Sequence, residues 1–143
     1  MVKPGLLHPS SQELTSPKVV EEVATLTVQA LLRTVPAAMP GIFFLSGEMP
    51  LSCDNEETAT IHLSNMNKLF AGKLPWHLAF SYGKALQKTA IVTWASTKDD
   101  EKTQKALLAR CHANSDAALG KYVPGTCSSV GTDGNIQQAA GPY

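Results

Sequence analysis

Lys3 is the residue in this chain whose type and position could do the most chemistry. It ends a short apolar segment and precedes Pro4, so we expect it at the carboxyl end of a strand. In folds of parallel strands joined by crossover helices, catalytic groups gather at that end of the strands. There, a lysine with a lowered pKa can attack a ketone carbonyl as the neutral amine. The protonated imine then withdraws electrons from the adjacent carbon, so that a C–C bond can break. From the residues alone, Lys3 could also be a solvated surface lysine.

Two later segments could hold an anion. Ser46 and Gly47 follow the apolar run of residues 41–45, and small residues there let backbone N–H groups face a ligand. Residues 81–84, Ser-Tyr-Gly-Lys, follow another apolar run and lead into an expected helix, whose N-terminus favours negative charge. Without further context, each segment is equally compatible with an ordinary strand-to-helix turn.

The spacing of apolar residues predicts the elements that carry these segments. The nearly unbroken apolar run at residues 41–45 is typical of a strand buried on both faces, and residues 1–3 and 77–82 are two further strand candidates. Helical spacing follows each run, over residues 17–34 with Ser16 as N-cap, over residues 54–70, and from Gly83 to about residue 94. A further helix is expected from residues 99–101 to about residue 119. Regular alternation of strand and helix predicts an α/β fold with parallel strands, and three strands are too few for an eight-stranded barrel.

Composition argues against several classes of function. The 143 residues include 12 basic and 12 acidic side chains, and no basic patch or acidic tail indicates a nucleic acid or a membrane surface as partner. No apolar run approaches the roughly 18 residues of a transmembrane helix. The three cysteines lack CxxC spacing, which indicates reduced thiols, and the four histidines lack metal-ligand spacing. We expect no metal and no other cofactor, and we expect both tryptophans, Trp76 and Trp94, to pack in the interior.

Taken in order, these segments resemble the last part of class I fructose-bisphosphate aldolases. The family carries its imine-forming lysine in a Leu-Leu-Lys-Pro segment, which residues 1–4, Met-Val-Lys-Pro, match conservatively. Residues 33–38, 75–86 and 110–115 also match the family in kind and order. The resemblance covers roughly residues 1–122 and the final tyrosine, and it leans toward plant-type members. It implies the C-terminal part of a (β/α)8 TIM barrel, about the last three strands with their helices, incomplete as a barrel on its own.

The resemblance also implies roles for individual residues. Lys3 would form the Schiff base, and Tyr143 would assist proton transfer at the imine stage. Five residues would hold one substrate phosphate: Ser46, Gly47, Ser81, Gly83 and Lys84.

Three positions near these residues depart from the family. Gly5 stands where the family usually has asparagine, Glu48 where it has glycine, and Lys84 where it has arginine. A carboxylate beside a phosphate repels it, and a lysine lacks the two-pronged guanidinium of arginine. We therefore expect weakened binding of the phosphorylated ketose.

The activity implied by the resemblance is that of a metal-independent lyase of glycolysis and gluconeogenesis. It cleaves fructose 1,6-bisphosphate reversibly into dihydroxyacetone phosphate and glyceraldehyde 3-phosphate. Full-length members carry further acid–base and phosphate-binding groups on earlier strands, which we do not expect here. The alternative is a truncated, non-catalytic paralogue or partial gene product that acts by association with aldolase subunits. An unrelated phosphate-binding α/β module would explain Gly47 and Gly83 but not Lys3, Tyr143 or the ordered matches.

We expect two parts in the chain. Residues 1–119 would form the partial barrel domain, and residues 120–143, which have almost no large apolar residues, a flexible C-terminal tail. The expected partner is the phosphorylated ketose, with no nucleic acid and no membrane. Full-length relatives are homotetramers, and the assembly of this chain stays open. A cytoplasmic location is implied, and a plant-type full-length form would also fit a plastid.

Overall fold

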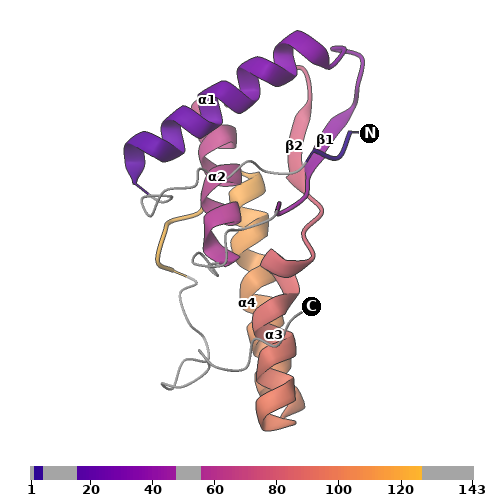
Figure 1. Cartoon of the computed structure of the whole chain (residues 1–143), viewed down its shortest axis with the longest axis vertical. Coiled ribbons are helices and arrows are strands. Elements are labelled where there is room, and N and C mark those ends of the chain that lie inside the picture. The colour runs from indigo at the N-terminus through magenta and orange to yellow at the C-terminus, as the bar shows by residue number, and fades with distance from the viewer. Residues whose placement is uncertain (1, 5–15, 48–55, 127–143) are drawn as a thin grey trace.

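The computed structural model describes residues 2–4, 16–47 and 56–126. The described residues form four helices and two short strands in the predicted order: α1 (Pro17–Thr34), β1 (Gly41–Phe44), α2 (Glu56–Leu69), β2 (His77–Phe80), α3 (Lys84–Thr97) and α4 (Asp100–Ala118). The strand expected near residue 1 is present only as a single bridge at Val2. Helix α1 crosses one end of the molecule, and α3 and α4 form a helical hairpin that extends toward the other end (Figure 1). None of the described helices is long and apolar enough to cross a bilayer.

Helix α1 begins where the sequence predicts. The Ser16 hydroxyl accepts a hydrogen bond from the Val19 N–H at 3.4 Å, and Pro17 occupies the first turn, where no intrahelical donor is needed. The helix ends at Thr34 because Val35, which precedes Pro36, is extended. The buried residues of α1 recur at helical spacing and face α2: Val20, Ala24, Val28 and Leu31.

The strands are parallel, as predicted from the alternation of elements. β1 pairs with β2 in register from Gly41 opposite His77 to Phe44 opposite Phe80. Residues 2–4 add a third segment on the other side of β1, through a parallel bridge between Val2 and Ile42. Such small parallel sheets depend on helices that cover at least one face.

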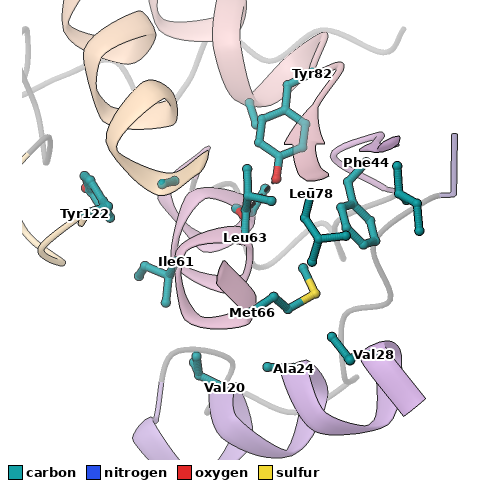
Figure 2. Close-up of a cluster of buried hydrophobic side chains, with 14 of the residues drawn as sticks. Val20, Ala24, Val28, Phe44, Ile61, Leu63, Met66, Leu78, Tyr82 and Tyr122 are labelled. Atoms are coloured by element: carbon teal, nitrogen blue, oxygen red, sulfur yellow. Dashed lines mark hydrogen bonds between the residues drawn. The ribbon is translucent and has the colours of Figure 1, made fainter. Parts of the chain in front are cut away.

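One face of the sheet forms the hydrophobic core with the helices. The side chains of Ile42, Phe44 and Leu78 are 0%, 0% and 4% exposed. Figure 2 shows Phe44 and Leu78 directed toward Leu63 and Met66 of α2, while Val20, Ala24 and Val28 of α1 face the same cluster from below. The sheet and α1 therefore share α2 as their common packing partner.

Helix α2 is buried on more sides than its sequence indicates. Its helically spaced apolar residues, Ala59, Leu63, Met66 and Phe70, are buried or half-buried, but residues 56–64 are buried without interruption. The reason is that α1, α3 and α4 all pack against α2. Its polar residues therefore lie inside the molecule and need partners there.

The two tryptophans differ in their surroundings. Trp76 is 5% exposed and its indole N–H donates to the Pro36 carbonyl at 2.9 Å, as expected for a packing residue. Trp94 is 47% exposed, so the prediction that it packs inside is wrong. The buried residues of α3 are small (Ala85, Ala90 and Thr93), which lets α4 approach closely and turns Trp94 outward. There the Lys98 ammonium lies 3.7 Å from the Trp94 ring centroid.

The end of α4 is closed by Gly120. Its N–H donates to the Ala117 carbonyl at 3.0 Å, and the next N–H, of Lys121, donates to the Asp116 carbonyl at 2.8 Å. Gly120 has a φ of +68°, and a Cβ there would lie 2.9 Å from the backbone nitrogen of Lys68 in α2. Glycine is therefore required both by the turn and by the close approach to α2.

The residues after α4 begin in contact with α2. Tyr122 is buried, and its hydroxyl donates to the Glu57 carboxylate at 2.5 Å. The Gly125 N–H donates to the same carboxylate oxygen. The predicted division between a domain and a tail at residue 120 stays a prediction, since residues 127–143 lie outside the described part of the chain.

Candidate active site

The carboxyl ends of the three parallel segments lie side by side. The Pro4 carbonyl accepts a hydrogen bond from the Leu45 N–H at 2.8 Å, and the Phe44 carbonyl accepts one from the Ser81 N–H at 2.7 Å. These two bonds bring together the places where each strand passes into its loop. We call this region, made of Lys3, Ser46, Gly47 and residues 81–84, the strand-end edge. It contains every predicted site residue that the structure describes.

Lys3 lies on the face of the sheet that the helices do not cover. It follows Val2, which pairs with Ile42, so it is level with Phe43. Because side chains alternate along a strand, six residues share this side: Lys3, Phe43, Leu45, His77, Ala79 and Ser81. We call it the uncovered face, because each of the six is exposed or half-buried. The described residues thus leave the Lys3 amine open to solvent.

Ser46 and Gly47 form the turn that leaves β1. Gly47 has a φ of +76°, a left-handed conformation that glycine adopts without strain. The side chain of Ser46 is buried, and Gly47 is half-buried. At this turn the glycine backbone is therefore more accessible to a ligand than the serine hydroxyl.

The N-terminus of α3 has unpaired donors. Gly83 is its N-cap and has no side chain to accept a bond, and within the described residues the N–H groups of Lys84 and Ala85 have no acceptor. Free N–H groups and the positive end of the helix dipole favour an anion at such a position. The side chain of Lys84 is exposed beside them. This end of α3 can therefore bind a negatively charged group.

Tyr82 fixes the loop between β2 and α3. Its buried hydroxyl donates to the Ala59 carbonyl of α2 at 2.9 Å. Burial raises the pKa of Tyr82 well above its ordinary value, against the opposing effect of the positive charge of Arg110. The hydroxyl thus stays protonated and remains a donor over the whole range in which proteins are folded.

A buried charged cluster lies behind the strand-end edge and was not predicted from the sequence. Arg110 of α4 and Glu56 of α2 are 3% and 8% exposed, and their charged groups lie 3.8 Å apart. Glu56 and Glu57 form the acidic first turn of α2, but they lie inside the molecule. The available signal was the position of Arg110 on the same helical stripe as three buried alanines: Ala106, Ala113 and Ala117.

Other expected residues lie outside the described part of the chain. These are Tyr143, for which a proton-transfer role was predicted, and the departing positions Gly5 and Glu48. Within residues 2–4, 16–47 and 56–126, no three His, Cys, Asp or Glu residues gather as they would around a metal ion. The described residues of the strand-end edge include no carboxylate. This edge therefore offers an amine and anion-binding N–H groups but no carboxylate general base.

The chain is similar to one family along nearly its whole length. A family model with the description fructose-bisphosphate aldolase class-I matches residues 1–140. A cytoplasmic fructose-bisphosphate aldolase isozyme 1 of Pisum sativum is 47% identical over 135 residues, which is 93% of this chain and 35% of that protein. The cytosolic fructose-bisphosphate aldolase 7 of Arabidopsis thaliana is 50% identical over 124 residues, 85% of this chain and 32% of that protein.

A solved structure agrees with the sequence matches. It is the fructose-bisphosphate aldolase of Plasmodium falciparum in complex with TRAP and a small-molecule inhibitor. The TM-score is 0.70 at 41% identity, over 86% of this chain and 33% of that one. The chain thus spans about a third of the length of the relatives that it matches.

Proposed function

Because the chain belongs to the class I fructose-bisphosphate aldolase family and has the α/β architecture of part of its barrel, we propose that it supplies the imine-forming lysine and one phosphate site of such an aldolase. The proposed reaction is the reversible cleavage of fructose 1,6-bisphosphate into dihydroxyacetone phosphate and glyceraldehyde 3-phosphate. Lys3 is the proposed Schiff-base residue, and the backbone of residues 46–47 and 81–84 the proposed phosphate site.

The proposed chemistry begins with the Lys3 amine. Its lone pair attacks the ketone carbon, and the carbonyl oxygen leaves as water, which gives a protonated imine. A base then removes the proton of the hydroxyl on the carbon that will leave, and the C–C bond to that carbon breaks, which releases the aldehyde. The electron pair of the broken bond forms the C=C bond of an enamine, and the π electrons of the imine move to its nitrogen. Protonation of the enamine carbon and addition of water release the second product and regenerate the amine. The described edge residues supply the nucleophile, and the base must come from elsewhere.

The observation that carries the proposal is the register of the strand ends. The hydrogen bond from Leu45 to Pro4 holds the lysine segment beside the turn after β1, and the bond from Ser81 to Phe44 holds residues 81–84 on the other side of that turn. A phosphorylated ketone needs both features within one small molecule's length, because the amine must reach the carbonyl while N–H groups hold the phosphate. The sequence resemblance supports each residue's role separately. The register of the strands supports the proposal that these residues act together in one site.

Trapping the imine tests the proposal. The chain is incubated with dihydroxyacetone phosphate and borohydride, and its intact mass is measured. We expect one covalent adduct in the parent chain and in Lys73→Arg, a control in an exposed residue outside the edge, and none in Lys3→Arg. An adduct that survives Lys3→Arg, or the absence of any adduct in the parent, would contradict the proposed role of Lys3.

The proposed phosphate site carries its own prediction. Lys84 keeps the positive charge of the family's arginine but lacks its two parallel donors. We therefore expect Lys84→Arg to bind dihydroxyacetone phosphate about tenfold more tightly, the effect of roughly one added charged hydrogen bond. Equal affinities in a titration of the two chains would mean that residue 84 does not contact the phosphate.

The uncovered face favours a second candidate function, association with other aldolase chains. Leu45 is 42% exposed there, and Lys3 and His77 are exposed on the same face, so this face is available to pack against another chain. Co-purification of the chain with a full-length plant aldolase, lost when Leu45 is changed to Glu, would support this candidate. The matched relatives are named cytoplasmic or cytosolic, which supports the cytosol as the proposed location.

A further inference from the structure

Arg110 binds the main chain of two helices at once. Its Nε–H and Nη2–H groups donate to the Ala85 carbonyl in the first turn of α3, at 3.0 and 2.8 Å. Nη2–H also donates to the Glu56 carbonyl, in the first turn of α2, at 2.9 Å. A rigid planar guanidinium thus connects the starts of the two helices that follow β1 and β2.

Glu56 accepts hydrogen bonds from donors in the same part of α3. Its carboxylate accepts from the Thr89 backbone N–H at 2.9 Å and from the Thr89 hydroxyl. In an α-helix the N–H of residue 89 would donate to the carbonyl of residue 85. Here Glu56 accepts from that N–H and Arg110 donates to that carbonyl, so the pair contacts both partners of one helical hydrogen bond. The pair therefore fixes both where α3 starts and how it is rotated.

A second layer of bonds orients the arginine. Nη2–H donates to the Thr60 hydroxyl at 2.7 Å, which in turn donates to the Asn114 side-chain oxygen at 2.8 Å. The Asn114 amide donates back to the Arg110 carbonyl at 2.9 Å. Because a buried ion pair is rarely a net source of stability relative to apolar packing, such a fully bonded cluster points to a role in fixing geometry.

The turn to which Arg110 is hydrogen-bonded directly follows the strand-end edge. Ala85 is the next residue after Lys84, and its own N–H is one of the free donors at the start of α3. At the other end of the loop, the Ser81 N–H is tied to the end of β1. Residues 81–84 are thus held between β1, through the Ser81 N–H, and Arg110, through the Ala85 carbonyl.

We propose that Arg110 is a positioning residue for phosphate: by tying the first turn of α3 to that of α2, it sets the spacing between the two backbone segments, residues 46–47 and 81–84, that bind a substrate phosphate together. This inference rests on the proposed phosphate site and adds to it a residue that touches no ligand. It predicts that changes at Arg110 alter phosphate recognition more than they alter the reactivity of Lys3.

The test compares two ketones that differ only in phosphate. Rates of borohydride-trapped adduct formation are measured with dihydroxyacetone phosphate and with dihydroxyacetone, and their ratio gives the preference for phosphate. We expect Arg110→Lys, which cannot form the two-pronged bond, to lower this ratio about tenfold. Val28→Ala, a cavity in α1 away from the edge, destabilises the chain as a control and should leave the ratio unchanged.

A second variant keeps the test informative if Arg110→Lys folds poorly. The double change Arg110→Met with Glu56→Gln removes both charges together, so no uncompensated charge stays buried. It should retain the Lys3-dependent adduct with dihydroxyacetone and lose the preference for phosphate.

The outcomes separate this inference from the proposed site. A parent chain with no preference for the phosphorylated ketone would overturn the phosphate site and, with it, this role of Arg110. A parent preference that persists in both Arg110 variants would leave the site standing and overturn only the positioning role.

Discussion

On the helix side of the sheet, Ile42 and Phe44 are 0% exposed, whereas Leu45, the next residue along, is 42% exposed on the other side. The apolar contacts that hold the described part of the chain together thus lie on one face of the sheet. The candidate chemistry, represented by Lys3 and Ser81, lies on the other face and at the strand ends. We therefore expect substitutions on the two faces to act on separate properties: those on the covered face on stability, and those on the uncovered face on ligand chemistry.

The largest effect is expected from Phe44→Ala. Removing a fully buried phenyl ring costs lost burial and leaves a cavity, about 3–5 kcal/mol of unfolding free energy. Urea unfolding followed by circular dichroism measures it. The matched control is Leu45→Ala on the uncovered face, for which we expect a change within about 0.5 kcal/mol. Similar losses in the two variants would mean that the uncovered face is in fact packed, and the contrast between the faces would fail.

An intermediate effect is expected from Tyr122→Phe, which asks how far the covered side extends. The change removes only the hydroxyl that donates to the buried Glu57 carboxylate. A lost bond to a charged group predicts about 1.5–3 kcal/mol of destabilisation in the same urea experiment. A neutral result would place the residues after α4 outside the cooperative unit, in agreement with a tail that starts at residue 120.

A smaller effect is expected at the turn between α3 and α4, away from both faces. The Lys102 backbone N–H, and next to it the Lys102 ammonium, lower the pKa of the Asp99 carboxyl below its ordinary value. A group whose pKa is lowered by folding contributes stability above its unfolded pKa, here about 3.9, and loses it as the pH falls through the folded value.

Asp99→Asn keeps a capping side chain but removes this titration. Comparing urea midpoints at pH 6 and pH 3, we expect the variant to lose less stability on acidification than the parent chain. The same loss in the two chains would show that the Asp99 charge contributes nothing to the cap.

The smallest effect on stability is expected from Lys3→Met, a substitution on the uncovered face that should change the chemistry and not the stability. Lys3 is exposed on the uncovered face, so its removal should change the unfolding free energy by no more than about 0.5 kcal/mol. Adduct formation with dihydroxyacetone phosphate should nevertheless be abolished. A stability loss as large as that of Tyr122→Phe would mean that Lys3 makes structural contacts.

Local signals in the sequence were sufficient for the helix starts and the strands. Ser16 with Pro17 begins α1 as expected, because an N-cap acts through bonds within three residues. Helix α4 begins at the expected acidic residues, with Asp99 as its N-cap. The apolar runs near residues 41 and 77 became β1 and β2, because a short apolar run bounded by turn residues is typical of a strand. The expected burial of residues 41–45 on both faces is wrong, since Phe43 is half-buried and Leu45 is exposed on the uncovered face.

Features that depend on distant contacts were not predicted. Nothing in residues 56–64 says that three other helices enclose them, and nothing in α3 says that its small residues face α4 and turn Trp94 outward. The Arg110 cluster likewise joins residues 25 to 54 positions apart. For the candidate site, the sequence and its resemblance to a family were sufficient to predict the residues. The register of the strands showed which of these residues lie next to one another. The exposure of Lys3 and the burial of Ser46 depend on which face of the sheet the helices cover, and no local sequence pattern predicts that.

The unequal burial of the two tryptophans makes the chain its own optical probe. Trp76 is sealed beside Pro36 and β2, so its emission should be blue-shifted and poorly accessible to acrylamide, while the solvent-facing Trp94 should be quenched readily. The two signals come from opposite ends of the molecule. Fluorescence of Trp94→Phe would therefore report on the strand region alone, and that of Trp76→Phe on the α3–α4 hairpin, so that the order in which the two parts melt can be followed without a label.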